Sequence, residues 1–137
     1  MNETTGELAS VNGRYYAMDR DTRWDRVKVA YDALVNGKGV RSANAVDSMN
    51  ESYYDGVTDE FIKPIVLLKE NGRPVATVKD NDIVLMFNFR ADRVRELTQV
   101  FTDETWNEFT VNSRPSLTEY VTFTQYDDDF NLPIVFP

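Results

Sequence analysis

The segment IVLMFNFRADR, residues 83–93, decides the fold class of this chain. Its first part, 83–89, is almost continuously apolar, as expected for a buried central β-strand. It runs without a spacer into Arg90-Ala91-Asp92-Arg93, and residues 94–101 then carry apolar side chains at helical spacing. A buried strand that leads directly into a helix is typical of α/β folds, in which ligands bind where such strands end.

The rest of the chain predicts helices interleaved with short strands. We expect helices over residues 22–36, 42–55, 94–101 and, as a short one, 105–109. Strands are expected over residues 8–11, 65–68, 75–78 and 121–123, with a hairpin turn at Asn71-Gly72 and a structured loop over 14–21. Together these elements predict an α/β fold, a three-layer-like mixed sheet flanked by helices.

Two of these helices carry apolar side chains at the spacing of one helical face. In the first, the face that should meet the core consists of Trp24, Val27, Tyr31 and Leu34. In the second, Val46, Met49 and Tyr53 share one face, and Ser42 is a candidate N-cap.

Composition excludes several classes of protein. The chain has 137 residues, which fits one domain, and no stretch approaches the roughly 18 uninterrupted apolar residues of a membrane-spanning helix. It contains no cysteine and no histidine, which excludes thiolate catalysis, a Ser-His-Asp triad and a histidine-bearing zinc site within these residues. The formal net charge of -8 argues against nucleic acid or an anionic membrane as a partner.

Arginines gather at two predicted helix starts, with Arg20 and Arg23 at the first helix and Arg90 and Arg93 at the third. A helix N-terminus carries partial positive charge, so cations there are unfavourable unless an anion binds between them. A guanidinium also matches the geometry of phosphate and carboxylate, so the pattern predicts a site for a small anion. The alternative is that each arginine pairs with a neighbouring carboxylate, from the set Asp19, Asp21, Asp25, Asp92 and Glu96.

Other chemistry lacks a complete set of residues. Neither of the common glycine-rich phosphate-binding patterns occurs, and no serine has a histidine to activate it. The run Asp127-Asp128-Asp129 is more typical of a solvated acidic loop than of a cation site. On its own residues, the chain is interpreted as a binder of small anions that contains no catalytic residue and no metal site.

The chain ends in an apolar stretch, Leu132 to Pro137, whereas the ends of a chain are normally polar. Two interpretations stay open. The tail either packs on the core of its own domain, or it is part of a segment that the rest of a larger protein would cover.

Two long motifs, Gly13 to Asp21 running on to Val27, and Asn88 to Arg93, are specific enough to compare with known families. Shorter ones occur between and after them: Asp59-Glu60-Phe61 with Pro64, Asp82-Ile83-Val84, and Tyr120 to Asp127 followed by Leu132-Pro133. In this order they resemble cofactor-independent phosphoglycerate mutase, the form of the glycolytic enzyme that needs no 2,3-bisphosphoglycerate. The resemblance spans the chain from about Leu8 onward.

The resemblance implies a fragment of a larger α/β domain. Family members have a metal-binding, phosphatase-like domain with a nucleophilic serine and two manganese or magnesium ions, and an inserted substrate-binding, or phosphotransferase, domain. This sequence resembles the later part of the inserted domain. The implied division is a polar leader over 1–7, a partial substrate-binding domain over 8–130, and the start of a linker toward the phosphatase-like domain over 131–137.

The resemblance also implies which residues bind substrate. Arg14 and Arg20 match arginines of the first motif, and Arg90, Ala91, Asp92 and Arg93 match the binding segment of the last. The ligand would be 3-phosphoglycerate or 2-phosphoglycerate. The helix-start pattern does not point to Arg14. It does suggest Arg23, to which the resemblance gives a structural role instead.

In the implied mechanism, arginines hold the phosphate and carboxylate while the serine of the other domain takes the phosphoryl group and returns it to the neighbouring hydroxyl. The parent would be a cytoplasmic, monomeric isomerase. This chain alone would be inactive, would bind no metal ion, and could self-associate through an open sheet edge. One alternative is a stand-alone anion-binding or interaction module without catalysis. Another, a self-sufficient phosphatase or mutase, would need a nucleophile and a metal site that the sequence does not show.

Overall fold

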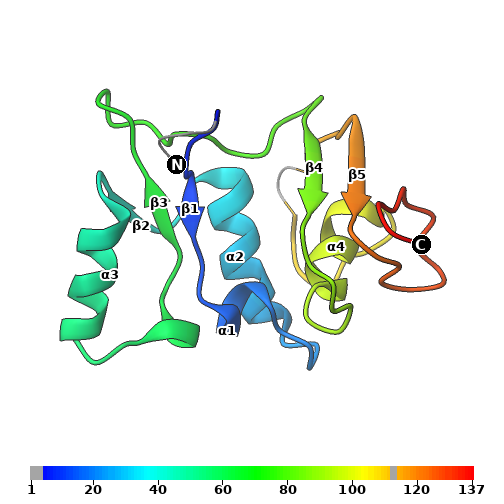
Figure 1. The fold of residues 1–137 in the computed structure, drawn as a ribbon, viewed down its shortest axis with the longest axis horizontal. Coiled ribbons are helices and arrows are strands. Elements are labelled where there is room, and N and C mark those ends of the chain that lie inside the picture. Colours follow the sequence, from blue (N-terminus) through cyan, green and yellow to red (C-terminus); the bar gives the residue numbers. More distant parts are fainter. Residues whose placement is uncertain (1–4, 112–113) are drawn as a thin grey trace.

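The computed structural model describes residues 5–111 and 114–137. Residues 1–4 of the expected polar leader lie outside the described residues. The elements follow one another in the order β1 (Ser10–Val11), α1 (Arg14–Ala17), α2 (Trp24–Asn36), β2 (Val40–Ser42), α3 (Ala45–Tyr54), the 3-10 helix η1 (Asp59–Phe61), β3 (Ile65–Leu67), β4 (Ile83–Met86), α4 (Arg95–Thr102) and β5 (Glu119–Thr122). Figure 1 shows them as two groups on either side of the long helix α2.

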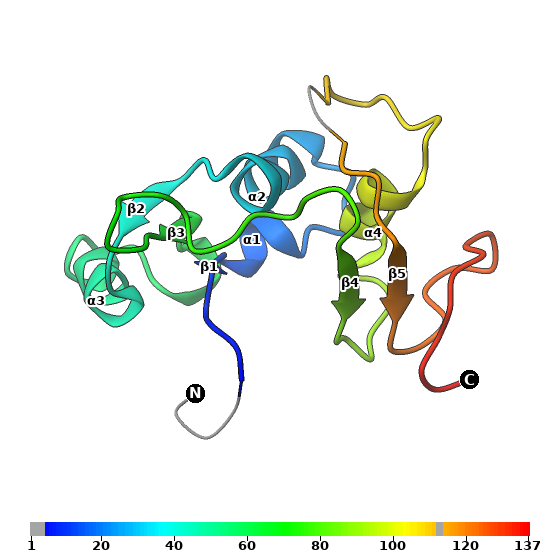
Figure 2. The same cartoon turned by 90° about the horizontal axis from the view of Figure 1, so that it is seen from above.

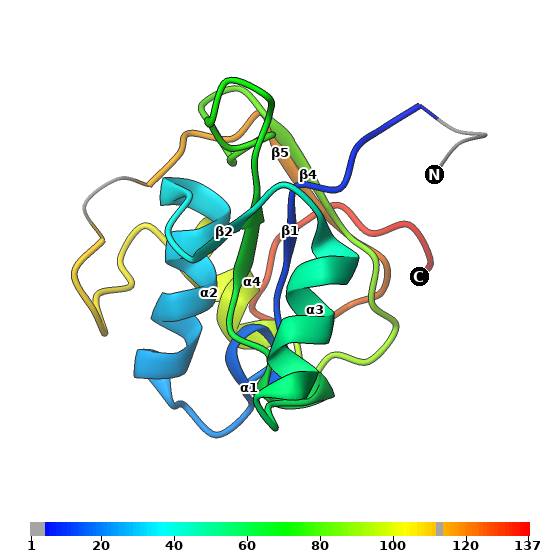
Figure 3. The same cartoon turned by 90° about the vertical axis from the view of Figure 1, so that its left-hand side faces the viewer.

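The strands form two small sheets. In the first sheet, β3 lies between β1 and β2, antiparallel to β1 and parallel to β2. In the second sheet, β4 and β5 pair in parallel, with Ile83 opposite Glu119. Figure 2 shows α4 on one side of the second sheet, and Figure 3 shows α2 and α3 on opposite sides of the first. The α/β class is therefore confirmed, but the strands are divided between two sheets.

The core lies where α2 and α4 meet β5. It is made of buried apolar side chains from these elements and from the segment after α4: Val27, Tyr31, Val35, Leu97, Val100, Phe101, Trp106 and Tyr120. The apolar faces expected for the first and third helices are thus confirmed. In the part of the chain that the structure describes, none of the helices has the length and apolar character of a membrane span.

The prediction of a buried central strand over residues 83–89 is wrong. The strand β4 ends at Met86, and Ile83 and Leu85 are 66% and 54% exposed. Phe87 and Phe89, which follow it, are exposed as well. The reason is that β4 pairs with β5 alone, and only its alternate residues, Val84 and Met86, pack against the core. An apolar run shows that a strand can be buried, but burial also requires a covering element.

Three smaller predictions also need correction. The second helix, α3, has no buried residue. Its N-cap is Asn44 and not Ser42, and the Asn44 side chain accepts the N–H of Asp47. Residues 75–78 form no strand, because after the turn at Asn71-Gly72 the pairing is limited to a bridge between Leu68 and Pro74. Residues 105–109 form turns and bends instead of a short helix.

A short helix replaces the loop expected after residue 13. The carbonyl of Gly13 accepts the N–H groups of Tyr16 and Ala17, which starts α1. A side chain at Gly13 would collide with the backbone of η1, since an added Cβ would lie 2.5 Å from the carbonyl oxygen of Glu60. The glycine therefore lets the first motif lie against η1.

The apolar tail lies along β5. Ile134 forms a parallel bridge with Thr122, and the N–H of Phe136 donates to the carbonyl of Phe123 at 2.8 Å. Leu132 packs against the core, whereas Val135 and Phe136 stay about half exposed. The tail thus covers the free edge of β5 without burying its own last side chains.

Two buried carboxyl groups join the loop after α1 to α4. Asp19 accepts the backbone N–H groups of Asp21 and Arg23, at 3.1 and 2.8 Å. Glu96, on α4, accepts the N–H of Thr22 at 3.3 Å, and its carboxyl group is hydrogen-bonded to that of Asp19. Thr22 has a φ of 56°, a left-handed conformation that is rare for threonine. The carboxyl groups hold this loop in place.

The proton between the two carboxyl groups belongs to Glu96. Burial, and then the hydrogen bond to Asp19, raise the pKa of Glu96 to about 7. Burial alone would also raise the pKa of Asp19, but hydrogen bonds from Glu96, Arg23 and Asp21 and the charge of Arg26 bring it below its ordinary value. Among the described residues, Oε1 of Glu96 is buried and accepts no N–H or O–H group.

Stability should depend on this proton. The pKa of Glu96 is higher in the folded chain than its ordinary value, so the free energy of unfolding should fall as the pH rises from 4.5 to about 7. Glu96→Gln keeps an N–H donor for Asp19 and cannot ionise. We expect it to abolish this fall and to be more stable than the wild type at pH 8, by on the order of 1–2 kcal/mol. Urea unfolding at pH 5 and pH 8 measures both; parallel pH profiles for the two proteins would contradict the assignment.

The position of β4 at the surface can be tested with two matched leucines. Leu97→Ala removes a core side chain that is 6% exposed, and we expect a loss of about 2–5 kcal/mol in the free energy of unfolding. Leu85→Ala changes an exposed side chain and should stay within about 0.5 kcal/mol of the wild type. Equal losses from the two variants would mean that residues 83–89 belong to the core.

Candidate functional site

The structure brings the two long sequence motifs together. From the first motif, Nη1 of Arg20 lies 3.2 Å from Oδ2 of Asp92. From the second, Nη2 of Arg90 lies 2.9 Å from the same oxygen, and Nη1 of Arg93 donates to the carbonyl of Met18 at 3.2 Å. Arg20, Arg90, Asp92 and Arg93 are called the arginine cluster below.

The arginine cluster carries excess positive charge. Arg20 and Arg90 contact Asp92, and Arg93 contacts the carbonyl of Met18, so three guanidiniums and one carboxylate give the cluster a formal charge of +2 in a chain whose net charge is -8. The side chains of Arg20 and Arg90 are 48% and 73% exposed, so N–H donors not used on Asp92 face solvent. The pairing of arginines with neighbouring carboxylates does occur, but one carboxylate serves two of them. The cluster therefore still has room for an external anion.

Asp92 is the internal counter-ion of the cluster. Its partial burial alone would raise its pKa, but hydrogen bonds from Arg90 and Arg20 hold the pKa below its ordinary value. Asp92 therefore stays ionised and keeps both guanidiniums in place. Ala91 contributes through its backbone, because its carbonyl accepts the N–H groups of Val94 and Arg95 and so forms the turn that precedes α4.

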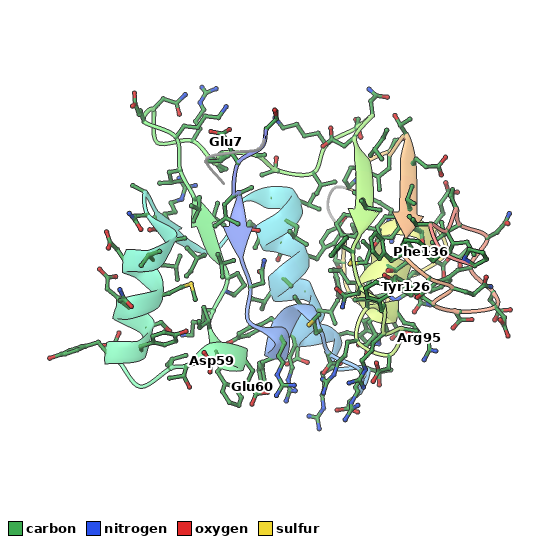
Figure 4. All side chains as sticks on the ribbon, viewed as in Figure 1. Glu7, Asp59, Glu60, Arg95, Tyr126 and Phe136 are labelled. Atoms are coloured by element: carbon green, nitrogen blue, oxygen red, sulfur yellow. The ribbon has the colours of Figure 1, made fainter. Side chains whose placement is uncertain are left out.

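Arg14 lies in a separate hollow, outside the contacts of the arginine cluster. It is the first residue of α1, and its Nη2 is 2.9 Å from Oε2 of Glu60. Figure 4 shows Glu60 where η1 meets α1. The hollow has a volume of about 400 Å³ and is lined by Asn12, Gly13, Arg14, Asp59 and Glu60. Arg14 thus belongs to the same motif as Arg20 but is held by a different carboxylate.

Arg23 and Arg26 have structural contacts. Arg23 is the N-cap of α2, and its backbone N–H donates to Asp19. The guanidinium of Arg26 lies 3.8 Å from the centre of the Tyr15 ring and 3.7 Å from Asp19. Sequence reasoning did not single out Arg26, because the contact that defines its role depends on how α1 folds back on α2.

A cleft with a volume of about 930 Å³ lies next to the arginine cluster. Arg20 and Asp92 line one side of it, and α4 and residues 127–132 line the rest. Its other charged side chains are mostly acidic: Arg95, Glu96, Asp103, Asp127 and Asp129. Arg95 donates to the carbonyl of Tyr126, and both are labelled in Figure 4. A phosphate is better matched by the exposed side of the arginine cluster than by this acidic cleft.

The described residues do not fit the two metal ions that the resemblance implies. Over residues 5–111 and 114–137, no group of three or more Asp or Glu side chains comes together as a ligand set. Asp127 and Asp129 lie in the same loop, but Asp127 is oriented toward Arg95, at 3.9 Å.

Comparison with known proteins relates the chain to one group of enzymes. The chain is similar to 2,3-bisphosphoglycerate-independent phosphoglycerate mutases of Flavobacterium psychrophilum (47% identity over 99% of the chain and 27% of the relative) and Parabacteroides distasonis (52% over 95% and 25%). It is also similar to a crystal structure of Leishmania mexicana phosphoglycerate mutase at low cobalt concentration, with a TM-score of 0.86 and 34% identity over 93% of this chain and 24% of that one.

The chain therefore spans about a quarter of the length of the relatives that it matches. A family model described as BPG-independent PGAM N-terminus (iPGM_N) matches residues 1–128. This match confirms the resemblance seen in the sequence, and the chain belongs to the BPG-independent phosphoglycerate mutase N-terminus family.

Proposed function

We propose that this chain is the substrate-binding part of a phosphoglycerate mutase that interconverts 3-phosphoglycerate and 2-phosphoglycerate. The observation that carries the proposal is the arginine cluster, in which Arg20 and Arg90, from motifs about 70 residues apart in sequence, share Asp92, and Arg93 joins the second motif to the carbonyl of Met18 in the first. The family membership supports the same function, since the relatives are named as phosphoglycerate mutases.

In this proposal the arginines divide the anionic groups of the substrate between them. Phosphoglycerate carries a phosphate and a carboxylate, and a guanidinium fork matches either one. Arg20, Arg90 and Arg93 form the main anion site, and Arg14, from the same motif as Arg20, binds the other anionic group. Asp92 holds Arg20 and Arg90 at the right separation, and the turn at Ala91 places residues 90–93 beside the first motif.

The residues of this chain bind and orient the substrate. Held arginines neutralise the charge of the phosphoglycerate and keep the glycerate in place between the two phosphoryl transfers. The serine nucleophile and the two manganese or magnesium ions would come from another part of the enzyme, where the metal ions would activate the serine. We propose residues 8–130 as the partial substrate-binding domain, 1–7 as a leader and 131–137 as the start of the linker. A cytoplasmic, monomeric parent enzyme fits this glycolytic role.

Phosphoglycerate should bind to the cluster directly. We expect 3-phosphoglycerate to cause saturable shifts of the arginine Nε–H signals in the NMR spectrum of the labelled chain, because guanidinium donors face solvent there. Arg90→Ala and Arg93→Ala should each weaken binding about tenfold or more, since each removes a charged hydrogen-bond partner of the anion.

The matched control is Arg41→Ala, which removes an exposed arginine on β2, whose hydrogen bond is to the carbonyl of Gly72. It should leave the titration unchanged. Absence of shifts at millimolar phosphoglycerate would contradict a preformed site in this chain. Equal affinity for sulfate and for phosphoglycerate would favour the alternative, a stand-alone anion-binding module.

The isolated chain should have no mutase activity. The sequence has no histidine or cysteine, and the described residues offer no metal ligand set, so no activated nucleophile can form. We expect no turnover of 3-phosphoglycerate above background in an assay coupled to enolase with Mn²⁺ present. Turnover that persists through repurification would show a self-sufficient catalyst and overturn this assignment.

A further inference from the structure

The residues just before Arg90 have little structure of their own to hold them. The strand β4 ends at Met86, and residues 87–90 belong to neither a helix nor a strand. The side chains of Phe87 and Phe89 are 68% and 66% exposed, so their burial does not fix this backbone either. A guanidinium binds an anion in a defined geometry only if the backbone that carries it is itself held in place. The arginine cluster therefore needs a restraint from another segment.

The residues that follow β5 supply this restraint. The hydroxyl of Tyr126 lies 2.6 Å from the carbonyl oxygen of Asn88 and 3.1 Å from that of Met86. The hydroxyl of Thr124 donates to the carbonyl of Phe89 at 2.9 Å. Two side chains beyond β5 thus contact three of the carbonyl groups in the segment that leads to the arginines.

Tyr126 also holds the other end of the binding segment. Its carbonyl accepts the Nε–H of Arg95, which is the first residue of α4; Figure 4 labels both residues. Residues 90–93 therefore lie between two points that one residue fixes, namely the carbonyls contacted by its hydroxyl and the side chain bound by its carbonyl. A segment that is held at both ends has few conformations left to it.

The hydroxyl of Tyr126 is suited to this task. Tyr126 is 2% exposed, and burial raises the pKa of its hydroxyl above the ordinary value. The hydroxyl therefore stays protonated, as a donor to backbone carbonyls must be. It has a single proton, and the shorter distance marks Asn88 as the main acceptor. Without the hydroxyl, the carbonyl of Asn88 would lose this donor and the backbone before Arg90 would lose a restraint.

We propose that Tyr126 is a positioning residue of the arginine cluster: its hydroxyl holds the backbone before Arg90 and so sets where that guanidinium meets an anion. The inference rests on the proposed function, in which the anion is phosphoglycerate. Arg90 does not supply the restraint itself, because its ion pair is with Asp92, only two residues along the chain. Arg93 depends on it less, since it also donates to a carbonyl of the first motif.

The pKa of Asp92 reports the position of Arg90 without any ligand. Burial raises this pKa, and the hydrogen bonds from Arg90 and Arg20 bring it below its ordinary value. In Tyr126→Phe we expect the backbone before Arg90 to move and its guanidinium to leave the carboxylate. The pKa of Asp92 should then rise toward its ordinary value, as measured by an NMR titration of its carboxyl carbon.

Two controls separate positioning from a general loss of structure. At the other end of α4, hydrogen bonds from Thr105 lower the pKa of Asp103, which should not change in the same titration. Tyr120→Phe removes a similarly buried hydroxyl that is bonded within the core, and it should leave the pKa of Asp92 unchanged. A rise at Asp103 in Tyr126→Phe, or an equal rise at Asp92 in both variants, would overturn the proposal.

Binding of 3-phosphoglycerate gives the second measurement. Tyr126→Phe should weaken the affinity about threefold or more, because a charged contact to the anion is misplaced, and Tyr120→Phe should leave it unchanged. An unchanged pKa of Asp92 in Tyr126→Phe, or an unchanged affinity where the wild type binds, would overturn the proposal. If the pKa of Asp92 rises as expected and neither protein binds phosphoglycerate, the positioning of Arg90 stands and the proposed function falls.

Discussion

The contact between the buried carboxyl groups of Asp19 and Glu96 joins the loop that carries Arg20 to α4. Asp19 and Glu96 are both buried and in contact, and two carboxylates in that position would repel each other in a medium of low dielectric constant. Below the raised pKa of Glu96, about 7, its proton lets the two groups attract. The two carboxyl groups also accept three successive backbone N–H groups, from residues 21, 22 and 23. The loop that carries Arg20 is thereby fixed on the helix that begins just after residues 90–93.

That constraint explains how an acidic chain contains a local positive site. The two motifs have separate local reasons for their shapes: Gly13 permits close contact with η1, and the carbonyl of Ala91 forms the turn before α4. Neither motif alone gathers much charge. Once the loop is fixed on α4, Arg20 and Arg90 from the two motifs both contact Asp92. Salt screens charges that lie more than about 10 Å away, so the positive potential at the cluster depends mainly on its own residues.

The sequence predicted the parts of this structure that depend on local periodicity. The faces of α2 and α4 were predicted because Val27, Tyr31, Leu97 and Phe101 recur at the helical period. The apolar run at 83–89 led to a wrong prediction of burial, because the burial of a strand depends on neighbouring elements that no local pattern reveals. Of the site, the helix-start pattern pointed to three arginines that the structure brings together, whereas Arg14 came from family resemblance alone. The Asp19–Glu96 contact spans 77 residues of sequence and left no signal in spacing.

Asp92 has a consequence for selectivity. Because a carboxylate already sits between Arg20 and Arg90, an arriving anion does not meet bare positive charge. It has to compete with a resident ion that is tethered to the chain and therefore present at high effective concentration. A monovalent ion such as chloride gains little from that exchange, whereas a phosphate dianion with several acceptor oxygens can engage both guanidiniums at once. If the cluster binds substrate as proposed, Asp92 would therefore favour anions of high charge and matching shape over anions that are merely abundant.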